Sequence, residues 1–421
     1  MVTTLSADRL AELVDGDDAF ALVDTRPEDS YESWHVPGAV HFPFGPEEEL
    51  DDRLEAFEDA VGDVDRVITI CAKGISSGNL AARLESATDA YDVATVDGGM
   101  TGWSGVYEHV EIDVGGDGSG AATDAPTIVQ LQRRAKGCLG YVVGCPATGE
   151  AIVVDPTDDI DEYEVAAEEA DLTIAGVVDT HVHADHVSGG RELADSLAVP
   201  YYLGARAADR GVDYEFTPLE RNEVLDVGDL EIKALSAPGH TSEMITLLVD
   251  GAALLTADTL HVDSVGRTEL EFSESEAGSA SEAASSAERS SADSHAAMPR
   301  DDGETASHEG AEGAEMLYET LHRTLLAEPE DVVILPGHVT VTASGEFEHS
   351  RPGEPVATTV REARTGIDLL DLEEEAFVER MADVGEKPAN YEAIIDLNRG
   401  REERPPEDRT ELELGPNNCS A

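Results

Sequence analysis

Lysine is almost missing from this chain of 421 residues, which has four lysines among 27 basic residues and sets them against 91 acidic residues. The formal net charge is −64. Proteins that bind nucleic acid place clustered lysine and arginine against the phosphates, and no such cluster is visible, so the composition argues against that function. So acidic a surface repels itself unless salt screens it, and we therefore expect a protein of halophilic type.

Long apolar runs and abundant cysteine are also missing. No stretch approaches the roughly 20 apolar residues that cross a bilayer, and the N-terminus MVTTLSADRL lacks the basic start and apolar core of a signal peptide. Four cysteines are too few and too scattered for a disulfide framework. We expect a cytoplasmic protein with no membrane association and reduced thiols. The sequence leaves the oligomeric state open, and a homo-oligomer is compatible with it.

Three composition breaks divide the chain into two folded blocks, 1–112 and 126–400. Residues 113–125 read as a flexible linker, and residues 401–421 as a charged, poorly ordered tail. The segment 272–312 is rich in Ser, Ala, Glu, Gly and Asp without apolar periodicity, and we expect a disordered acidic insertion there.

Both blocks mix strands with helices. In the first block, apolar runs such as Ala19–Asp24 and Arg66–Ile70 alternate with helical spacing, which predicts a parallel α/β domain. The second block opens with several strands, including Thr127–Gln132, and continues with further strand pairs and helices between them. We expect a sandwich of two sheets flanked by helices.

Cys71 follows the run Arg66–Ile70 directly and opens the segment CAKGISSGNLAARL, which leads into a helix. This position places a thiol at a strand-to-helix turn. The backbone N–H groups of such a turn and the positive end of the helix favour thiolate over thiol. The pattern indicates a nucleophilic cysteine.

This segment resembles the active-site loop of rhodanese sulfurtransferases, as do VDTRPEDSYESWHVPGAVHFP at 23–43 and VDGGMTGW at 96–103. The resemblance covers nearly all of the first block. It implies that Cys71 carries a persulfide within a loop made of Ala72, Lys73, Gly74, Ile75, Ser76 and Ser77. Familiar loops of this family carry an arginine, whereas Lys73 is the only cation here, which predicts poor use of thiosulfate. The alternative is a catalytically silent domain used for docking.

Three histidines and two aspartates fall within DTHVHADH, residues 179–186. A strand-like run precedes this cluster and a helical segment follows it, so the cluster lies on a connecting loop. The alternative to a metal site is a solvated polar loop, but Asp and His seldom cluster so densely without a metal. His240, Asp258 and His338 each follow an apolar strand in the same block and can converge on the same sheet edge.

The order THVHADH, PGHT, AD and PGH resembles the metallo-β-lactamase superfamily and covers the second block. The resemblance implies that this block folds as an αβ/βα sandwich. Within it, VGRTEL at 265–270 and KPANYEAIIDLNRG at 387–400 are most similar to persulfide dioxygenases. The resemblance implies one Fe(II) per chain held by His181, His240 and Asp258, with positions open for the two substrates, a low-molecular-weight thiol persulfide and dioxygen. The surrounding groups that orient these ligands would be His183, Asp185, His186 and His338.

The same seven residues can instead hold two zinc ions, as in glyoxalase II. His181, His183 and His240 would bind one ion, Asp185, His186 and His338 the other, and Asp258 would bridge them. The ligand count does not choose between these schemes. The GRT after Asp258, the KPANYE segment and the fused sulfurtransferase favour the oxygenase. We therefore expect oxidation of a thiol persulfide to thiol and sulfite, with a thioester hydrolase as the alternative. The rhodanese domain would load persulfide onto a thiol or combine sulfite with sulfane sulfur.

Overall fold

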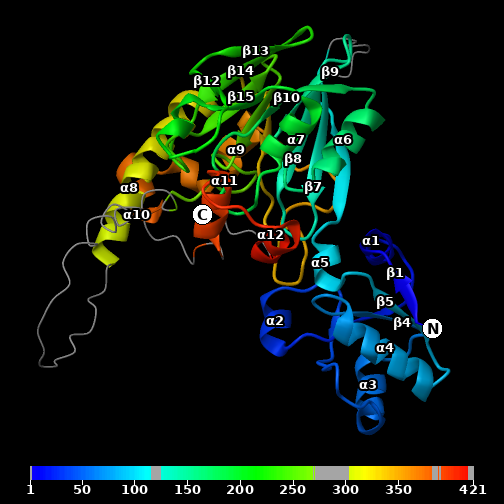
Figure 1. Cartoon of the computed structure of the whole chain (residues 1–421). Coiled ribbons are helices and arrows are strands. Elements are labelled where there is room, and N and C mark those ends of the chain that lie inside the picture. The colour runs from blue at the N-terminus through cyan, green and yellow to red at the C-terminus, as the bar shows by residue number, and fades with distance from the viewer. Residues whose placement is uncertain are drawn as a thin grey trace, which may run out of the picture.

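The computed structural model describes residues 2–114, 125–268, 270, 303–381, 387 and 390–415, without the side chains of 303–309. Its N-terminal sheet is entirely parallel and has the order β1-β5-β4-β2-β3 (Figure 1). The strands are β1 (Thr3–Leu5), β2 (Ala21–Asp24), β3 (Val40–His41), β4 (Arg66–Ile70) and β5 (Asp92–Val96). Every residue of β2 is buried, as expected for a parallel strand covered on both faces.

Helices cover both faces of this sheet. They are α1 (Ala7–Asp15), α2 (Glu28–Ser33), α3 (Leu54–Val61), α4 (Ile75–Ala87) and α5 (Gly99–Trp103). One apolar core contains Leu10 and Trp103, and the core on the opposite face contains Phe57 and Leu80. The parallel α/β domain predicted from the sequence is therefore confirmed.

The second sheet has the order β12-β11-β10-β9-β8-β7-β6. Its strands are β6 (Tyr107–Ile112), β7 (Thr127–Arg133), β8 (Leu139–Gly144), β9 (Glu150–Val154), β10 (Thr173–Val178), β11 (Tyr201–Gly204) and β12 (Thr217–Leu219).

The position of strand β6 corrects the expected end of the first domain at residue 112. It pairs antiparallel with β7, with His109 opposite Leu131, and so belongs to the second domain. The physical reason is burial, because Val110 and Ile112 pack into the core between the two sheets of that domain. Of the expected linker 113–125, residues 115–124 lie outside the described residues.

The third sheet faces the second and has the order β13-β14-β15-β16-β17-β18. Its strands are β13 (Val224–Val227), β14 (Leu230–Ser236), β15 (Ile245–Val249), β16 (Ala253–Ala257), β17 (Val333–Pro336) and β18 (Thr358–Thr359). A single apolar core joins the facing sides of these two sheets, with Val143 and Val154 on one sheet and Leu247 and Leu255 on the other. The predicted two-sheet sandwich is confirmed.

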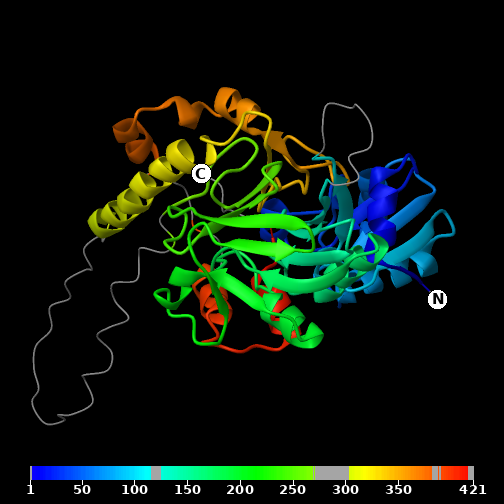
Figure 2. The same ribbon diagram turned by 90° about the horizontal axis from the view of Figure 1, so that it is seen from above.

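Helices flank the sandwich on its two outer sides: α8 to α10 lie on one side, and α7, α11 and α12 on the other (Figure 2). The helices of this domain are α6 (Ile160–Glu169), α7 (Gly190–Leu197), α8 (Gly303–Thr320), α9 (Val360–Gly366), α10 (Glu374–Met381), α11 (Tyr391–Asn398) and α12 (Pro406–Leu412). Among the described helices, none is both long and apolar enough to cross a membrane.

Two segments expected to be disordered contain helices. Residues 303–312 of the predicted insertion form the first part of α8, while 272–302 lie outside the described residues. The predicted tail contains α12, and Glu413 beyond it is 2% exposed because its carboxylate pairs with Arg133 at 2.5 Å. Charge composition alone predicts that such residues are solvated, because it does not reveal a distant partner such as Arg133.

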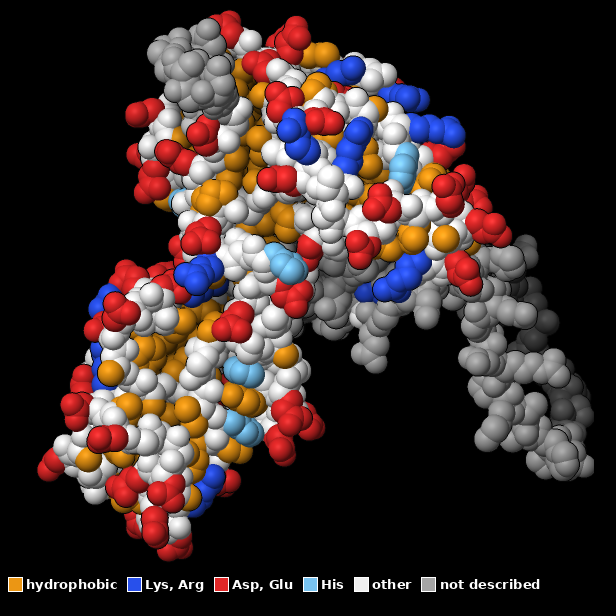
Figure 3. Space-filling view, turned by 180° about the vertical axis from the view of Figure 1, so that it is seen from behind, with side chains coloured by type: hydrophobic (Ala, Val, Ile, Leu, Met, Phe, Trp, Pro, Cys, Tyr) orange, Lys and Arg blue, Asp and Glu red, His pale blue; other side chains and the backbone are white. Residues whose placement is uncertain are grey.

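Acidic side chains are spread over both domains on the face that Figure 3 shows, and basic side chains are fewer. The net charge is therefore not concentrated in one domain on that face.

Candidate functional site

Cys71 lies in the loop between β4 and α4, as the sequence predicts. The segment at 96–103 packs directly against this loop, where Met100 N–H donates to the Cys71 carbonyl at 2.8 Å. Gly99 has φ +59°, and a Cβ there would lie 2.1 Å from that carbonyl oxygen. Only glycine permits this close approach, which explains why the two motifs occur together.

The Cys71 thiol is 5% exposed and accepts a hydrogen bond from Ser77 Oγ at 3.3 Å. It lines a cavity of about 640 Å³ between its own loop and two further segments, Thr25–Pro27 and Pro43–Pro46. The thiol therefore faces a space of the size that small-molecule ligands fill, about 300–1,000 Å³.

The second candidate site gathers three side chains from three strand ends. His181 follows β10, His240 follows β14 and Asp258 follows β16 directly. Asp258 Oδ2 lies 3.9 Å from His181 Nε2 and 3.6 Å from His240 Nε2. Two ligands about 2.1 Å from one ion lie roughly 3–3.5 Å apart, so a small closure of these atoms forms a metal site.

Hydrogen bonds orient both histidines so that Nε2 faces Asp258. His240 Nδ1 donates to the Arg267 carbonyl at 2.7 Å, which leaves the lone pair on Nε2. The Thr180 hydroxyl donates to Asp155 at 2.9 Å, so its oxygen accepts from His181 Nδ1 at 2.9 Å. Both rings therefore have the tautomer that a metal ligand needs.

The three inward-facing atoms fit a metal ion. Among the described residues, none forms a hydrogen bond with His181 Nε2, His240 Nε2 or Asp258 Oδ2, although all three atoms are buried. Buried polar atoms without partners are rare in proteins, and an absent ion explains a set of three. Burial lowers the pKa of His181 well below its usual value and also lowers that of His240, which keeps both rings neutral as ligands.

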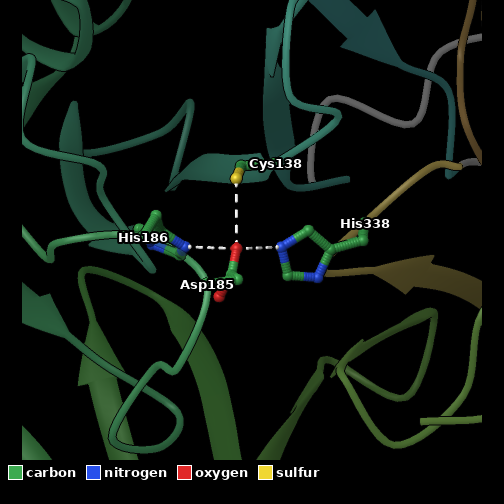
Figure 4. A group of neighbouring side chains, drawn as sticks. All are labelled: Cys138, Asp185, His186 and His338. Atoms are coloured by element: carbon green, nitrogen blue, oxygen red, sulfur yellow. Dashed lines mark hydrogen bonds and ion pairs between the residues drawn. The ribbon is translucent and has the colours of Figure 1, made fainter. Parts of the chain in front are cut away.

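A second buried group lies beside the first and converges on one oxygen, Asp185 Oδ2 (Figure 4). His338 Nε2 lies 2.8 Å from this atom, His186 Nδ1 lies 3.0 Å from it, and Cys138 Sγ donates to it at 3.3 Å. Four residues of three ligand types therefore surround a position that could also hold a cation.

His338 joins the two groups. Its Nδ1 lies 2.5 Å from Asp258 Oδ1, while its Nε2 contacts Asp185. Burial opposes the charged ring, but the two carboxylates outweigh it and raise the pKa of His338 well above its usual value. For Asp258, burial opposes the charged carboxylate and so raises its pKa. His338 and the other neighbouring histidines outweigh burial and hold this pKa well below its ordinary range. Asp258 is thus an anion with one engaged and one open oxygen.

The ring of His183 lies beside that of His181, with ring centroids 4.1 Å apart, but its ligand atoms belong to a different group. Its Nε2 lies 3.2 Å from Asp155 Oδ1, and with Asp179 these residues form a separate buried group. Burial lowers the pKa of His183, but the two carboxylates outweigh it and raise the pKa. The two-zinc arrangement requires a ligand atom of His183 to join those of His181 and His240. In this structure the ligand atoms of His183 instead group with those of Asp155 and Asp179.

The C-terminal segment holds the metal-binding loop in place. Asn398 Nδ2 donates to the carbonyls of His183 and His186 at 2.9 and 2.8 Å, and its Oδ1 accepts from Ser188 N–H at 2.9 Å. Glu413 accepts from Val187 N–H. The KPANYEAIIDLNRG motif therefore acts through Asn398, which lies in its last turn of helix.

Sequence reasoning missed three residues of these groups: Asp155, His261 and Cys138. Asp155 follows β9 as Asp258 follows β16, so the same strand-end pattern could have found it. His261 Nε2 lies 3.7 Å from Asp258 Oδ1, three positions along the chain. Cys138 carries no sequence signal, because only its bridge to His338 across the sandwich brings it to the site.

Comparison with known proteins agrees with the division of the chain into two domains. Residues 6–105 match the model of the rhodanese-like domain, and residues 133–338 match that of the metallo-beta-lactamase superfamily. The chain therefore joins a rhodanese-like domain to a metallo-beta-lactamase fold domain. A metallo-beta-lactamase from Staphylococcus aureus subsp. aureus COL is 22% identical with a TM-score of 0.52, covering 66% of this chain and 74% of that chain, which shows the fold alone.

Two curated relatives differ in activity. A hydroxyacylglutathione hydrolase from Hahella chejuensis is 36% identical over 122 residues, which are 28% of this chain and 46% of the relative. The mitochondrial persulfide dioxygenase of Bos taurus is 25% identical over 150 residues, which are 35% of this chain and 58% of the relative. The chain spans only about half the length of these relatives.

Proposed function

We propose that the second domain oxidises a low-molecular-weight thiol persulfide with dioxygen, at one Fe(II) held by His181, His240 and Asp258. The observation that carries this proposal is the convergence of three buried ligand atoms without hydrogen-bond partners among the described residues. Two histidines and one carboxylate form the ligand set typical of non-haem Fe(II) oxygenases. When bound, such an iron supplies open coordination positions and redox chemistry for dioxygen.

The chain's own residues have separate tasks in this proposal. Arg267 and Thr180 fix the two histidine rings, and His338 holds Asp258 Oδ1 so that only Oδ2 is offered. The carboxylate then contributes one ligand atom. His338 in turn is held by Asp185, which prevents the imidazole from swinging away. Positioning of this kind typically changes metal affinity or activity by about 10–100-fold when it is lost.

The rhodanese-like domain has a transfer role in the same proposal. Cys71 takes a sulfane sulfur from a donor and passes it on, and the cavity beside its thiol supplies the space for the donor. The silent docking alternative is less favoured, since the thiol borders a cavity that a small ligand can enter and accepts a hydrogen bond from Ser77.

A second candidate is hydrolysis of a thioester at two zinc ions. It is favoured by the group of Cys138, Asp185, His186 and His338, which could hold a second ion, and by similarity to hydroxyacylglutathione hydrolases. It requires Asp258 to bridge two ions, whereas Asp258 Oδ1 contacts His338. We therefore rank it below the oxygenase.

Metal analysis and oxygen uptake together test the proposal. The full chain is purified without oxygen in high salt, since its net charge of −64 favours that solvent, and is analysed for iron and zinc. We expect about one iron per chain and oxygen consumption when a thiol persulfide is added. Two zinc ions per chain, with thioester hydrolysis and no oxygen consumption, would instead establish the hydrolase.

A further inference from the structure

The cavity beside Cys71 is lined mainly by apolar side chains. Pro27, Pro43, Phe44, Pro46 and Ile75 form much of its wall. Ile75 is 67% exposed, which is unusual for a large apolar residue at the start of a helix. An apolar wall around a reactive thiol favours a ligand that brings apolar surface of its own.

Each charged side chain among the described residues that line this cavity is paired with an opposite charge. Arg26 is buried and contacts Asp24, with Nη2 donating at 2.7 Å and Nε at 2.9 Å, and Nη2 also donates to the Trp34 carbonyl at 2.5 Å. Glu48 pairs with Arg53 at 2.6 Å. Neither charge is left to attract a ligand.

Lys73, the only cation of the Cys71 loop, is paired by the other domain. Its ammonium group contacts the carboxylate of Glu411 in α12, which lies between the two domains (Figure 1). Asp408 and Glu407 of the same helix add negative charge nearby, and the hydrogen bond with Glu411 is the main reason that the pKa of Lys73 is raised. The C-terminal helix thus cancels the charge that an anionic donor would use.

We infer that Cys71 exchanges sulfane sulfur with organic thiol persulfides in preference to thiosulfate, and that Glu411 strengthens this preference by pairing with Lys73. The inference rests on the proposed transfer role of Cys71. Thiosulfate is a dianion, and it would lose water on entering an apolar cavity in which no cation is free to replace that water. The persulfide group of an organic donor carries at most one charge, and its organic part can contact the proline, phenylalanine and isoleucine side chains.

The transfer step is balanced without an external oxidant. The Cys71 thiolate attacks the outer sulfur of the persulfide, a new S–S bond forms at Cys71, and the old S–S bond breaks. The leaving thiolate takes the electron pair. With thiosulfate the leaving group would be sulfite. By microscopic reversibility, the same cavity also disfavours the reverse step, in which sulfite collects sulfur from Cys71. The site therefore moves sulfur between organic thiols.

Donor competition in the full chain tests this inference. Transfer to cyanide is measured with propanethiol persulfide and with thiosulfate at one fixed ionic strength. We expect the wild-type kcat/KM for the persulfide to be higher by about tenfold or more. Glu411→Gln should raise the ratio of thiosulfate to persulfide kcat/KM roughly two- to fivefold, the factor expected for loss of an exposed ion pair, mainly through a lower KM for thiosulfate.

The control is Glu330→Gln, which breaks an exposed ion pair of the same kind, with Arg361 at 3.0 Å, away from Cys71. It should leave the donor ratio unchanged. A Glu411→Gln protein in which both donors change in parallel would assign Glu411 a merely structural role and overturn the inference, as would equal use of both donors by the wild type. If neither donor adds a sulfur atom to Cys71, as judged by peptide mass, the proposed transfer function itself fails.

Discussion

The two candidate sites of this chain are built in opposite ways. In the Cys71 site the thiol and the loop around it are contiguous in sequence, two further segments complete the cavity, and the charged side chains that line it are paired. The metal site is formed by His181, His240 and Asp258 from three separate strand ends, and each presents an atom without a hydrogen-bond partner among the described residues. A contiguous loop suits a covalent nucleophile, which needs one reactive atom surrounded by the backbone N–H groups of its own turn. A metal needs several ligands converging from different directions, which only tertiary structure supplies.

The largest effect should come from removing a metal ligand. We expect His181→Ala to reduce metal affinity and persulfide-dependent oxygen uptake by more than about 100-fold, because losses of that order already follow from disturbing residues behind the ligands. Iron content and oxygen uptake measure this. Sulfur transfer by Cys71 should persist.

A matched control is His349→Ala, since His349 is an exposed histidine of the same domain. It should retain iron and oxygen uptake. Loss of both activities in a folded His181→Ala protein would contradict the independence of the two sites.

Cys71→Ser makes the complementary test. The serine hydroxyl is a far weaker nucleophile than a thiolate, so sulfur transfer should fall to the uncatalysed level while oxygen uptake and iron content remain. Transfer from a persulfide donor to cyanide is the measurement. Undiminished transfer would show that Cys71 is not the sulfur carrier.

A smaller effect is expected where the C-terminal segment supports the metal loop. Asn398→Ala removes three hydrogen bonds to that loop and leaves two buried carbonyls and one N–H without their partner, so unfolding free energy should fall by about 2–4 kcal/mol. Urea denaturation measures the change, and metal affinity should weaken with it. Asn79→Ala removes a single exposed hydrogen bond and is the control, with a change below about 0.5 kcal/mol. Similar values for the two variants would rule out this support role.

The smallest effect concerns the boundary strand β6. His109 lies 3.1 Å from Glu162 of α6, and this hydrogen bond raises the pKa of His109 despite the opposing effect of burial. A raised folded-state pKa stabilises the protein below the unfolded value of about 6.5, and this contribution disappears as pH rises through the folded pKa. His109→Gln should therefore cost under about 1 kcal/mol near pH 5.5 and less at higher pH. Urea denaturation at several pH values checks this, and Glu162→Gln should weaken the same pH dependence without abolishing it, because Glu169 at 3.5 Å also raises the pKa of His109. A constant difference would disprove the ion pair's contribution.

Much of the fold could be predicted from the sequence. The strand Arg66–Ile70 is mostly apolar and buried, and its position before Cys71 predicted the loop on which the thiol lies. The domain boundary could not be predicted in this way, because the sequence of β6 is compatible with a strand of either domain until its pairing with β7 is known. The order of the C-terminal helix α12 is not predictable from its own residues, because its charged side chains pair with Lys73 and Asp158, which are distant in sequence.

By itself, then, the sequence determined two domains, a thiol at a strand-to-helix turn and a buried set of histidines and aspartates, because each of these is written in local pattern. The tertiary structure decided which atoms of that set face one another: His183 towards Asp155, Cys138 towards Asp185, and His338 between two carboxylates. It also decided that α12 would place Glu411 against Lys73. Charge pairing and ligand convergence depend on distances in space, which local spacing along the chain does not specify.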